Sequence, residues 1–148
     1  MNTTPLRQLL RKKGTFVITI DPGATVYDAI ATMVDHNVGA ILVTKDGALV
    51  GIFTERDYLR RIVLRGRTSK TTAVKDVMTA EVITVTPDTC VETALSVMTE
   101  ARCRHLPVIA DGRLAGLVSI GDCVKHLLRN AEAEIDTLEG YVRGRYPA

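Results

Sequence analysis

The feature that most constrains the fold is an internal repeat. Residues 18–65 align with residues 83–130 at a constant shift of 65 positions and without a gap. Twelve positions are identical, and they include a proline, two glycines and two aspartates that recur at predicted turns and helix starts. Two copies are too few for a solenoid, which needs roughly three repeats to bury its core. We therefore expect two similar units related by a pseudo-twofold axis.

Each copy predicts the same order of elements, β-α-β-β-α. A short strand leads through a proline turn into a helix with an apolar stripe, and Val26, Ala29 and Met33 belong to that stripe in the first copy. Two apolar strands follow, joined by Asp-Gly, which is a strong hairpin signal. A second helix closes each copy. The predicted elements are 16–20, 26–34, 40–44, 49–53 and 54–64 in the first copy, and 82–85, 91–98, 106–109, 114–118 and 119–130 in the second.

The predicted fold class is mixed α/β (α+β): two βαββα repeats that share a core, with short flanking helices. One repeat alone has a single sheet face to bury and would be marginally stable. The expected segments are an N-terminal segment (1–15) with a helix near 6–12, a first repeat (16–66), a linker (67–81) with a helical turn at 74–78, a second repeat (82–130) and a helical tail (131–148).

The sharpest local motif is Gly-apolar-apolar-Thr/Ser-x-x-Asp, which occurs at 51–57 and at 116–122. A hydroxyl followed three residues later by an acid is a capping box, which closes a helix N-terminus and contributes about 1 kcal/mol. The same geometry suits a nucleotide, because free N–H groups there bind phosphate and a carboxylate accepts both ribose hydroxyls. Both interpretations stay open at this point. The chain has neither a GxGxxG motif nor a P-loop, so any nucleotide site is of another kind.

The repeats and this motif resemble a tandem pair of cystathionine-β-synthase-type (CBS) domains over about residues 15–130. The segments 37–43 (NVGAILV), 77–79 (VMT) and 104–108 (RHLPV) fit the same family, in its stand-alone bacterial form with short flanking helices. The resemblance implies a regulatory module without catalytic residues, which binds an adenosine nucleotide in clefts between the repeats. AMP is the expected ligand, with ADP, ATP and NAD as alternatives.

The resemblance also implies residue roles. Asp57 and Asp122 would hold ribose hydroxyls, and Thr54 and Ser119 would meet phosphate. The residues expected to border the adenine are Thr19, Ile20, Ala40 and Ile41 in the first copy, and Thr84, Val85, His105, Leu106 and Pro107 in the second.

The two copies differ in charge at matched positions. Glu55-Arg56 aligns with Ile120-Gly121, and Gly39-Ala40 aligns with Arg104-His105. We hypothesise that Arg56, Arg104 and His105 supply phosphate charge unevenly, so that the two pockets differ in ligand or affinity. The alternative for Arg104 and His105 is a solvated strand edge.

Three other functions are weighed against nucleotide binding. An enzyme needs a nucleophile with a base, or a metal; Cys103 lies between two arginines, which would favour its thiolate, but no matched histidine and acid are evident. The histidines (36, 105 and 126) show no metal-ligand spacing, and the cysteines (90, 103 and 123) form no Cys-x-x-Cys.

The basic clusters at 7–13 and 60–70 lack interleaved aromatics for base stacking. The formal charge of +2 is also small, so no nucleic-acid partner is expected. A ligand-free structural or interaction dimer is the third alternative.

Location and partners follow from what the sequence lacks and from the family. No apolar run approaches the roughly 18 residues that span a bilayer, and the N-terminus does not resemble a signal peptide, so a cytoplasmic location without membrane contact is expected. The resemblance implies a homodimer formed through the helices, and a regulated protein that the sequence does not name. The predicted tail helix, with Ile135, Leu138 and Tyr141, is a candidate contact, or else a cover for the chain's own core.

Overall fold

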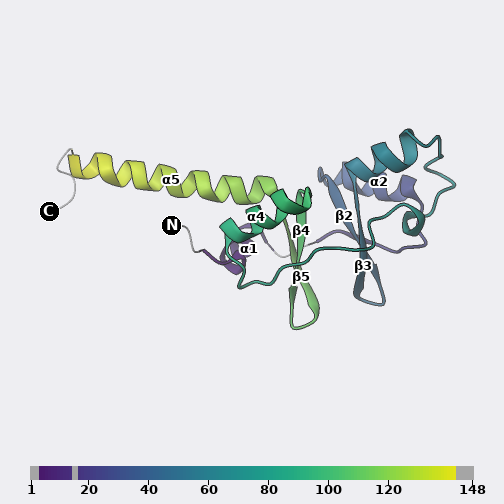
Figure 1. The fold of residues 1–148 in the computed structure, drawn as a ribbon, viewed down its shortest axis with the longest axis horizontal. Coiled ribbons are helices and arrows are strands. Elements are labelled where there is room, and N and C mark those ends of the chain that lie inside the picture. The colour runs from purple at the N-terminus through teal and green to yellow at the C-terminus, as the bar shows by residue number, and fades with distance from the viewer. Residues whose placement is uncertain (1–3, 15–16, 143–148) are drawn as a thin grey trace.

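The computed structural model describes residues 4–14 and 17–142 and shows two βαββα units side by side, with one long helix projecting from the second (Figure 1). The helices and strands are α1 (Leu6–Lys13), β1 (Thr19–Ile20), α2 (Val26–Asp35), β2 (Ala40–Lys45), β3 (Ala48–Thr54), α3 (Glu55–Tyr58), α4 (Val91–Ala101), β4 (His105–Ala110), β5 (Arg113–Ser119) and α5 (Ile120–Val142). A π-helical turn (Leu59–Val63) follows α3, and a 3-10 turn (Val74–Asp76) lies between the units.

The strand pairing repeats at the same shift of 65 residues as the sequence. In the first unit β1 pairs parallel with β2, and β2 pairs antiparallel with β3. In the second unit β4 and β5 form the matching hairpin, and both hairpins carry a register shift at the same aligned place. The predicted strand at 82–85 was too long: in the second unit it is a single parallel bridge between Val85 and Val108.

The two hairpin turns have nearly the same backbone φ angles. Asp46 and Gly47 have φ of 52° and 80°, and Asp111 and Gly112 have φ of 52° and 75°. Positive φ at both central residues is the type I′ turn, whose twist matches that of antiparallel strands and which Asp-Gly favours. The hairpins predicted from Asp-Gly are therefore confirmed.

Each unit has its own core, and a third cluster joins the two units. The helical stripe of α2 packs with β2 and β3 in the first core, and α4 packs with β4 and β5 in the second. Ala40, Leu42 and Ile52 bury the opposite face of the first hairpin against Leu114 and Leu117 of the second. The two repeats thus stabilise each other through their sheets.

The segment that precedes each repeat packs on the other repeat. In α1, Leu6, Leu9 and Leu10 lie in the core of the second unit, whereas Val74 and Val77 of the linker lie in the core of the first. The backbone contacts match: the N–H of Leu6 donates to the carbonyl of Thr89, and that of Val74 donates to the carbonyl of Ala24. The linker is therefore also a structural part of the first unit, and α1 is a structural part of the second.

The second helices of the two repeats differ. In the first unit the helix is short and passes into the π-helical turn, whereas α5 continues without a break to Val142. The predicted helical tail is therefore confirmed up to that residue, as a continuation of the last helix; 143–148 lie outside the described residues. Ile135 and Leu138 are exposed, so the alternative that this tail covers the chain's own core is wrong for these two residues. No helix in the described ranges is long and apolar enough to cross a membrane.

Candidate functional site

Both copies of the repeated motif form helix caps. In the first, the Thr54 hydroxyl accepts from the N–H of Asp57 at 3.2 Å, and the Thr54 N–H donates to Asp57 Oδ2 at 3.0 Å. In the second, Ser119 and Asp122 make the same reciprocal pair at 3.1 and 2.8 Å. Such caps satisfy N–H groups that the first turn leaves unpaired. The capping interpretation is thus confirmed for both motifs, and any ligand must use what the caps leave free.

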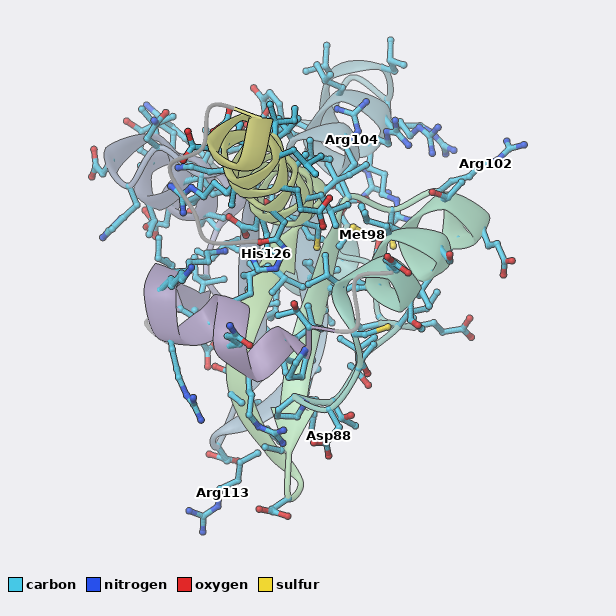
Figure 2. All side chains as sticks on the ribbon, turned by 90° about the vertical axis from the view of Figure 1, so that its left-hand side faces the viewer. Asp88, Met98, Arg102, Arg104, Arg113 and His126 are labelled. Carbon is cyan, nitrogen blue, oxygen red and sulfur yellow. The ribbon has the colours of Figure 1, made fainter. Side chains whose placement is uncertain are left out.

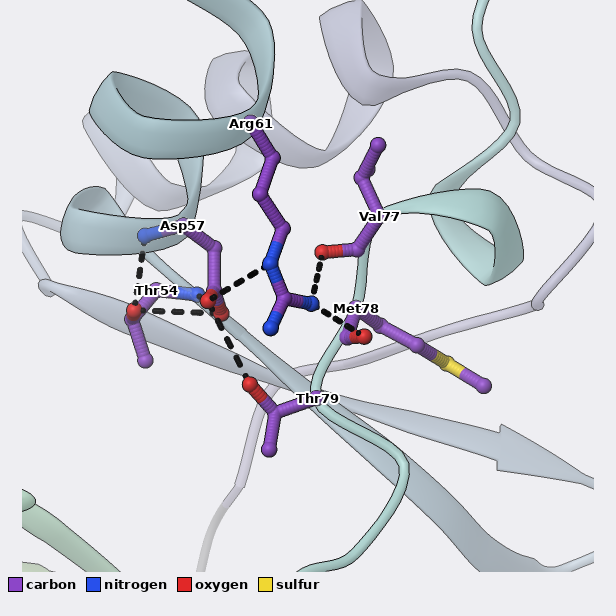
Figure 3. A network of polar contacts seen from close by, with 6 residues as sticks. All are labelled: Thr54, Asp57, Arg61, Val77, Met78 and Thr79. Atoms are coloured by element: carbon purple, nitrogen blue, oxygen red, sulfur yellow. Dashed lines mark hydrogen bonds and ion pairs between the residues drawn. The ribbon is translucent and has the colours of Figure 1, made fainter.

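The first motif leaves one carboxylate oxygen outside the cap. Asp57 is only 7% exposed, and its Oδ1 accepts a 3.3 Å hydrogen bond from the hydroxyl of Thr79 (Figure 3). Arg61 Nε lies 4.0 Å from the same oxygen, and Arg61 Nη1 donates to the carbonyls of Val77 and Met78 at 2.9 and 2.7 Å. The linker and the helix therefore hold this carboxylate in place. Its outer oxygen already accepts from a hydroxyl, which is the chemistry that a ribose offers.

A cleft of about 620 Å³ opens at this carboxylate and extends between the repeats. The first unit contributes the start of its second helix, and the second unit contributes the loop between α4 and β4. Arg56 donates a 3.5 Å hydrogen bond across the cleft to the carbonyl of Arg102. Two acids, Glu55 and Asp57, face five arginines in the lining: Arg56, Arg60, Arg61, Arg102 and Arg104. The cleft therefore has an excess of positive charge and suits an anion.

One of these arginines has an unusual backbone conformation. Arg102 follows the C-terminus of α4 in the left-handed region, with φ 56°, and its aligned partner in the first repeat is Asn37, with φ 53°. Asparagine tolerates this conformation, whereas arginine is strained there by roughly 1 kcal/mol. Figure 2 shows Arg102 at the end of α4, on the same side of the molecule as Arg104. Strain of this kind is common at binding sites, so Arg102 is a functional candidate.

Both repeats match a known protein family. The model for the CBS domain matches residues 13–64 and 74–129, which is most of the chain and both repeats. The chain belongs to the CBS-domain family. This CBS pair is 51% identical over 127 residues to the CBS domain-containing protein CBSX3, mitochondrial, of Arabidopsis thaliana; the match covers 82% of this chain and 62% of that relative. It is 35% identical over 119 residues to YhcV of Bacillus subtilis, covering 80% of this chain and 84% of the relative.

Solved structures agree with this assignment. A CBS-domain protein from Burkholderia ambifaria, described provisionally as a signal-transduction protein, is 43% identical with a TM-score of 0.83; the match covers 85% of this chain and 95% of that one. A CBS-domain containing protein from Agrobacterium tumefaciens is 39% identical with a TM-score of 0.80, and the match covers 83% and 98% of the two chains. The predicted resemblance and fold class are confirmed, and the chain is a tandem CBS pair close to stand-alone bacterial ones.

The second acid of the CBS pair has an internal partner. The Lys13 ammonium donates to Asp122 Oδ2 and, at 2.7 Å, to the carbonyl of Leu117. Burial alone raises the pKa of Asp122, but hydrogen bonds from Lys13 and Ser119 outweigh it and hold that pKa below its usual value. Lys13 reaches this position because α1 is longer than the 3-10 turn that occupies the equivalent place in the first unit. Asp122 lines a smaller cavity of about 170 Å³, beside α1.

His105 lies where the two motifs approach each other. It lines the cleft beside Glu55, and in the β4–β5 ladder it stands opposite Ser119 of the second motif. Burial lowers the pKa of His105, and the charge of Lys13 lowers it further. The imidazole is therefore neutral at pH 7. The lowered pKa weighs against the hypothesis that His105 supplies phosphate charge, and the neutral ring offers a flat face and a hydrogen-bonding nitrogen. The role of His105 in ligand binding stays a prediction.

The predicted ligand-binding residues separate into two groups. Thr54, Arg56, Asp57, Arg104 and His105 line the cleft of about 620 Å³ together. The others do not line this cleft: Thr19, Ile20, Ala40, Ile41, Thr84, Val85, Pro107, Ser119 and Asp122. Ile41 and Pro107 are buried in strands, so their side chains are unavailable to a ligand in this conformation. Any contact of these two residues with a ligand would therefore be through the backbone, and their role in ligand binding stays a prediction.

Several cleft residues were not predicted. Arg60 and Arg61 were considered only within the basic cluster at 60–70, and Thr79 only within a family segment, yet all three line the cleft. Arg102 could have been found from its alignment with Asn37, because a residue tolerant of positive φ is replaced by one that is not.

The cysteines do not support thiol catalysis at the cleft. Burial raises the pKa of Cys103, which corrects the expectation that its flanking arginines lower it. The pKa of Cys90 is lowered by hydrogen bonds from Thr93, but Cys90 begins α4 outside the cleft lining. Within the described ranges, no three His, Cys, Asp or Glu side chains are grouped so as to hold a metal ion.

Proposed function

We propose that this CBS pair is a regulatory sensor that binds one adenosine nucleotide in the cleft beside Asp57. The observation that supports this most strongly is the pairing of two chemistries in one cavity. At one side, a fixed carboxylate oxygen accepts from a hydroxyl of the protein itself. Besides Arg61, which holds Asp57, the rest of the lining has four arginines (Arg56, Arg60, Arg102 and Arg104), and guanidinium groups can bind phosphate oxygens through charge-assisted hydrogen bonds. A nucleotide carries both a ribose diol and phosphate.

The ligand's adenine and phosphates have distinct candidate partners. The neutral ring of His105 and the apolar side chains of Ile52 and Leu59 provide a surface for a base. The hydroxyl of Thr79 is the group that a ribose would displace from Asp57. Because five arginines face two acids, we expect ADP and ATP to bind at least as tightly as AMP, and NAD to be an alternative ligand.

We expect the pocket at Asp122 to be weaker. A nucleotide there would have to displace the Lys13 ammonium from a carboxylate whose pKa that ammonium already lowers. The proposed difference between the two pockets therefore rests on α1 as well as on the arginines of the first cleft.

A signalling mechanism follows from the location of the cleft. Residues of both repeats line it, so a nucleotide would bridge the two units and favour the arrangement in which both contact it. The solved relative from Burkholderia ambifaria, provisionally described as a signal-transduction protein, supports such a role. The regulated partner remains a prediction, as does the cytoplasmic location, since one relative is named mitochondrial.

The test is thermal unfolding with AMP, ADP, ATP, NAD and, as a base control, GMP. Asp57→Asn and Asp122→Asn are matched variants, because each keeps an oxygen that accepts the capping N–H. Ligand at 100 times its Kd stabilises the folded protein by about 2.7 kcal/mol. We expect that shift with adenosine nucleotides in the wild type and in Asp122→Asn, and its loss in Asp57→Asn. No shift with any nucleotide would leave the ligand-free interaction module as the better account, since both caps are complete without a ligand.

A further inference from the structure

The cavity of about 170 Å³ beside α1 lies between that helix and the first turns of α5, and is here called the α1–α5 pocket. Its lining comes from one face of each helix. The residues from α1 are Leu9, Lys12 and Lys13, and those from α5 are Asp122, Lys125, His126 and Arg129, all at steps of three or four along their helices. No residue of the first repeat lines this pocket, so it is separate from the cleft between the repeats.

The α1–α5 pocket has three positive charges that the protein does not neutralise. The only acid in its lining is Asp122, and the Lys13 ammonium already pairs with that carboxylate. Lys12, Lys125 and Arg129 are exposed and form no ion pair with any described residue. Like charges gathered around one small concavity repel each other and attract a counter-ion of higher charge. The pocket therefore favours an anion with two or more negative charges.

A buried polar ring supplies the second observation. His126 is only 8% exposed, and Figure 2 shows it between α5 and α1. Its Nε2 lies 3.4 Å from Asn130 Nδ2, and no hydrogen bond from the described part of the chain reaches its Nδ1. Buried polar atoms are rarely left without a partner. The aligned residue of the first repeat is Arg61, whose guanidinium donates to two linker carbonyls, so the first unit supplies a partner where the second unit does not.

We propose that the α1–α5 pocket binds a small phosphate-type oxyanion. Lys12, Lys125 and Arg129 neutralise its charge, since ammonium and guanidinium groups both form charge-assisted hydrogen bonds with phosphate oxygens. His126 completes the coordination from the buried side. Pockets for larger ligands start at roughly 300 Å³, so this one is too small for a nucleotide and suits orthophosphate or pyrophosphate. The site does not depend on nucleotide binding at Asp57.

The first test is calorimetric titration of the full chain with pyrophosphate and with orthophosphate. Sodium chloride keeps the ionic strength equal throughout, because salt screens exposed charges. We expect pyrophosphate to bind more tightly than orthophosphate, since it carries more negative charge. Lys125→Gln and Arg129→Gln should each weaken pyrophosphate binding by roughly fivefold. Arg113→Gln is the matched control, because Arg113 is also exposed but lies on the hairpin of the same unit, away from the pocket (Figure 2); it should change affinity by less than about twofold.

The arginines of the nucleotide cleft are the competing site for the same ion, so Arg104→Gln is measured as well. We expect this variant to bind pyrophosphate as the wild type does. Binding that is weakened in Arg104→Gln and kept in Arg129→Gln would place the ion in the cleft and overturn the proposal. An absence of binding to the wild type, or equal weakening in all the variants including Arg113→Gln, would also overturn it.

The second test locates the ion through the ring signals of the three histidines in NMR spectra. His126 lines the α1–α5 pocket, His105 lines the nucleotide cleft, and His36 is exposed on the first repeat. We expect pyrophosphate to shift the ring signals of His126 and to leave those of the other two unchanged. A shift of His105 without one of His126 would contradict the proposed site. A chain that binds no nucleotide would still show the His126 shift, so the two proposals can fail separately.

Discussion

Replacing Arg102 by asparagine separates the stability of this CBS pair from its ligand affinity. Arg102 adopts φ 56° after α4, and Asn37 adopts φ 53° at the aligned place after α2. The backbone at this place thus favours asparagine, which tolerates the left-handed region better than arginine. We expect Arg102→Asn to stabilise the unliganded protein by about 0.5–1 kcal/mol, which raises Tm by about 1–4 °C for a chain of this size.

The same substitution removes one of the five guanidinium groups of the cleft. An exposed guanidinium contributes up to about 1 kcal/mol to an ionic contact, so ATP should bind roughly 3- to 6-fold more weakly. Thermal unfolding and calorimetric titration measure the two effects. Asn37→Arg is the control: it should lower Tm by a similar amount and leave ATP affinity unchanged. If Arg102→Asn lowers Tm, or if it leaves affinity unchanged while raising Tm, the link between strain and binding is refuted.

Three further outcomes are expected. The free energy of unfolding of the wild type falls from pH 7 to pH 5. Histidine in the unfolded chain takes up a proton near pH 6.5, whereas burial lowers the pKa of His105 in the folded chain. Urea unfolding should therefore show a smaller fall in His105→Gln. Gly51→Ala should cost about 1–3 kcal/mol in the same assay, since a Cβ would lie 2.4 Å from Met78 Sδ and 3.0 Å from the carbonyl oxygen of Thr79. Iodoacetamide should modify Cys90 first and Cys123 last, as followed by mass spectrometry. Hydrogen bonds lower the pKa of Cys90, whereas burial raises the pKa of Cys123 to about 11. Equal rates of modification would contradict these environments.

Local features of the fold could be predicted from the sequence because neighbouring residues determine them. The Asp-Gly turns and the caps at Thr54 and Ser119 depend on residues within a few positions of each other, and both are present as expected. Because the sequence repeats, the same local predictions apply to both units. The second unit's first strand was overestimated, because its sequence is apolar but only Val85 pairs with the hairpin.

Contacts between distant segments could not be predicted from a single sequence. The exchange of α1 and the linker between repeats depends on which core each segment reaches, and apolar spacing alone does not show this. Lys13 and Asp122 are far apart in the sequence, so nothing local suggests their contact, which makes the two motifs unequal. The cleft likewise combines a helix start from one repeat with a loop from the other. The two motifs could therefore be predicted from the sequence, whereas the residues that line the cleft with them were only partly identified.

Calorimetric titration of the wild type with ATP tests the central proposal most directly, because it gives the stoichiometry and the affinity together. The account predicts one nucleotide per chain, with binding lost in Asp57→Asn and retained in Asp122→Asn. Two equal sites per chain, or binding that is lost in Asp122→Asn and kept in Asp57→Asn, would contradict it.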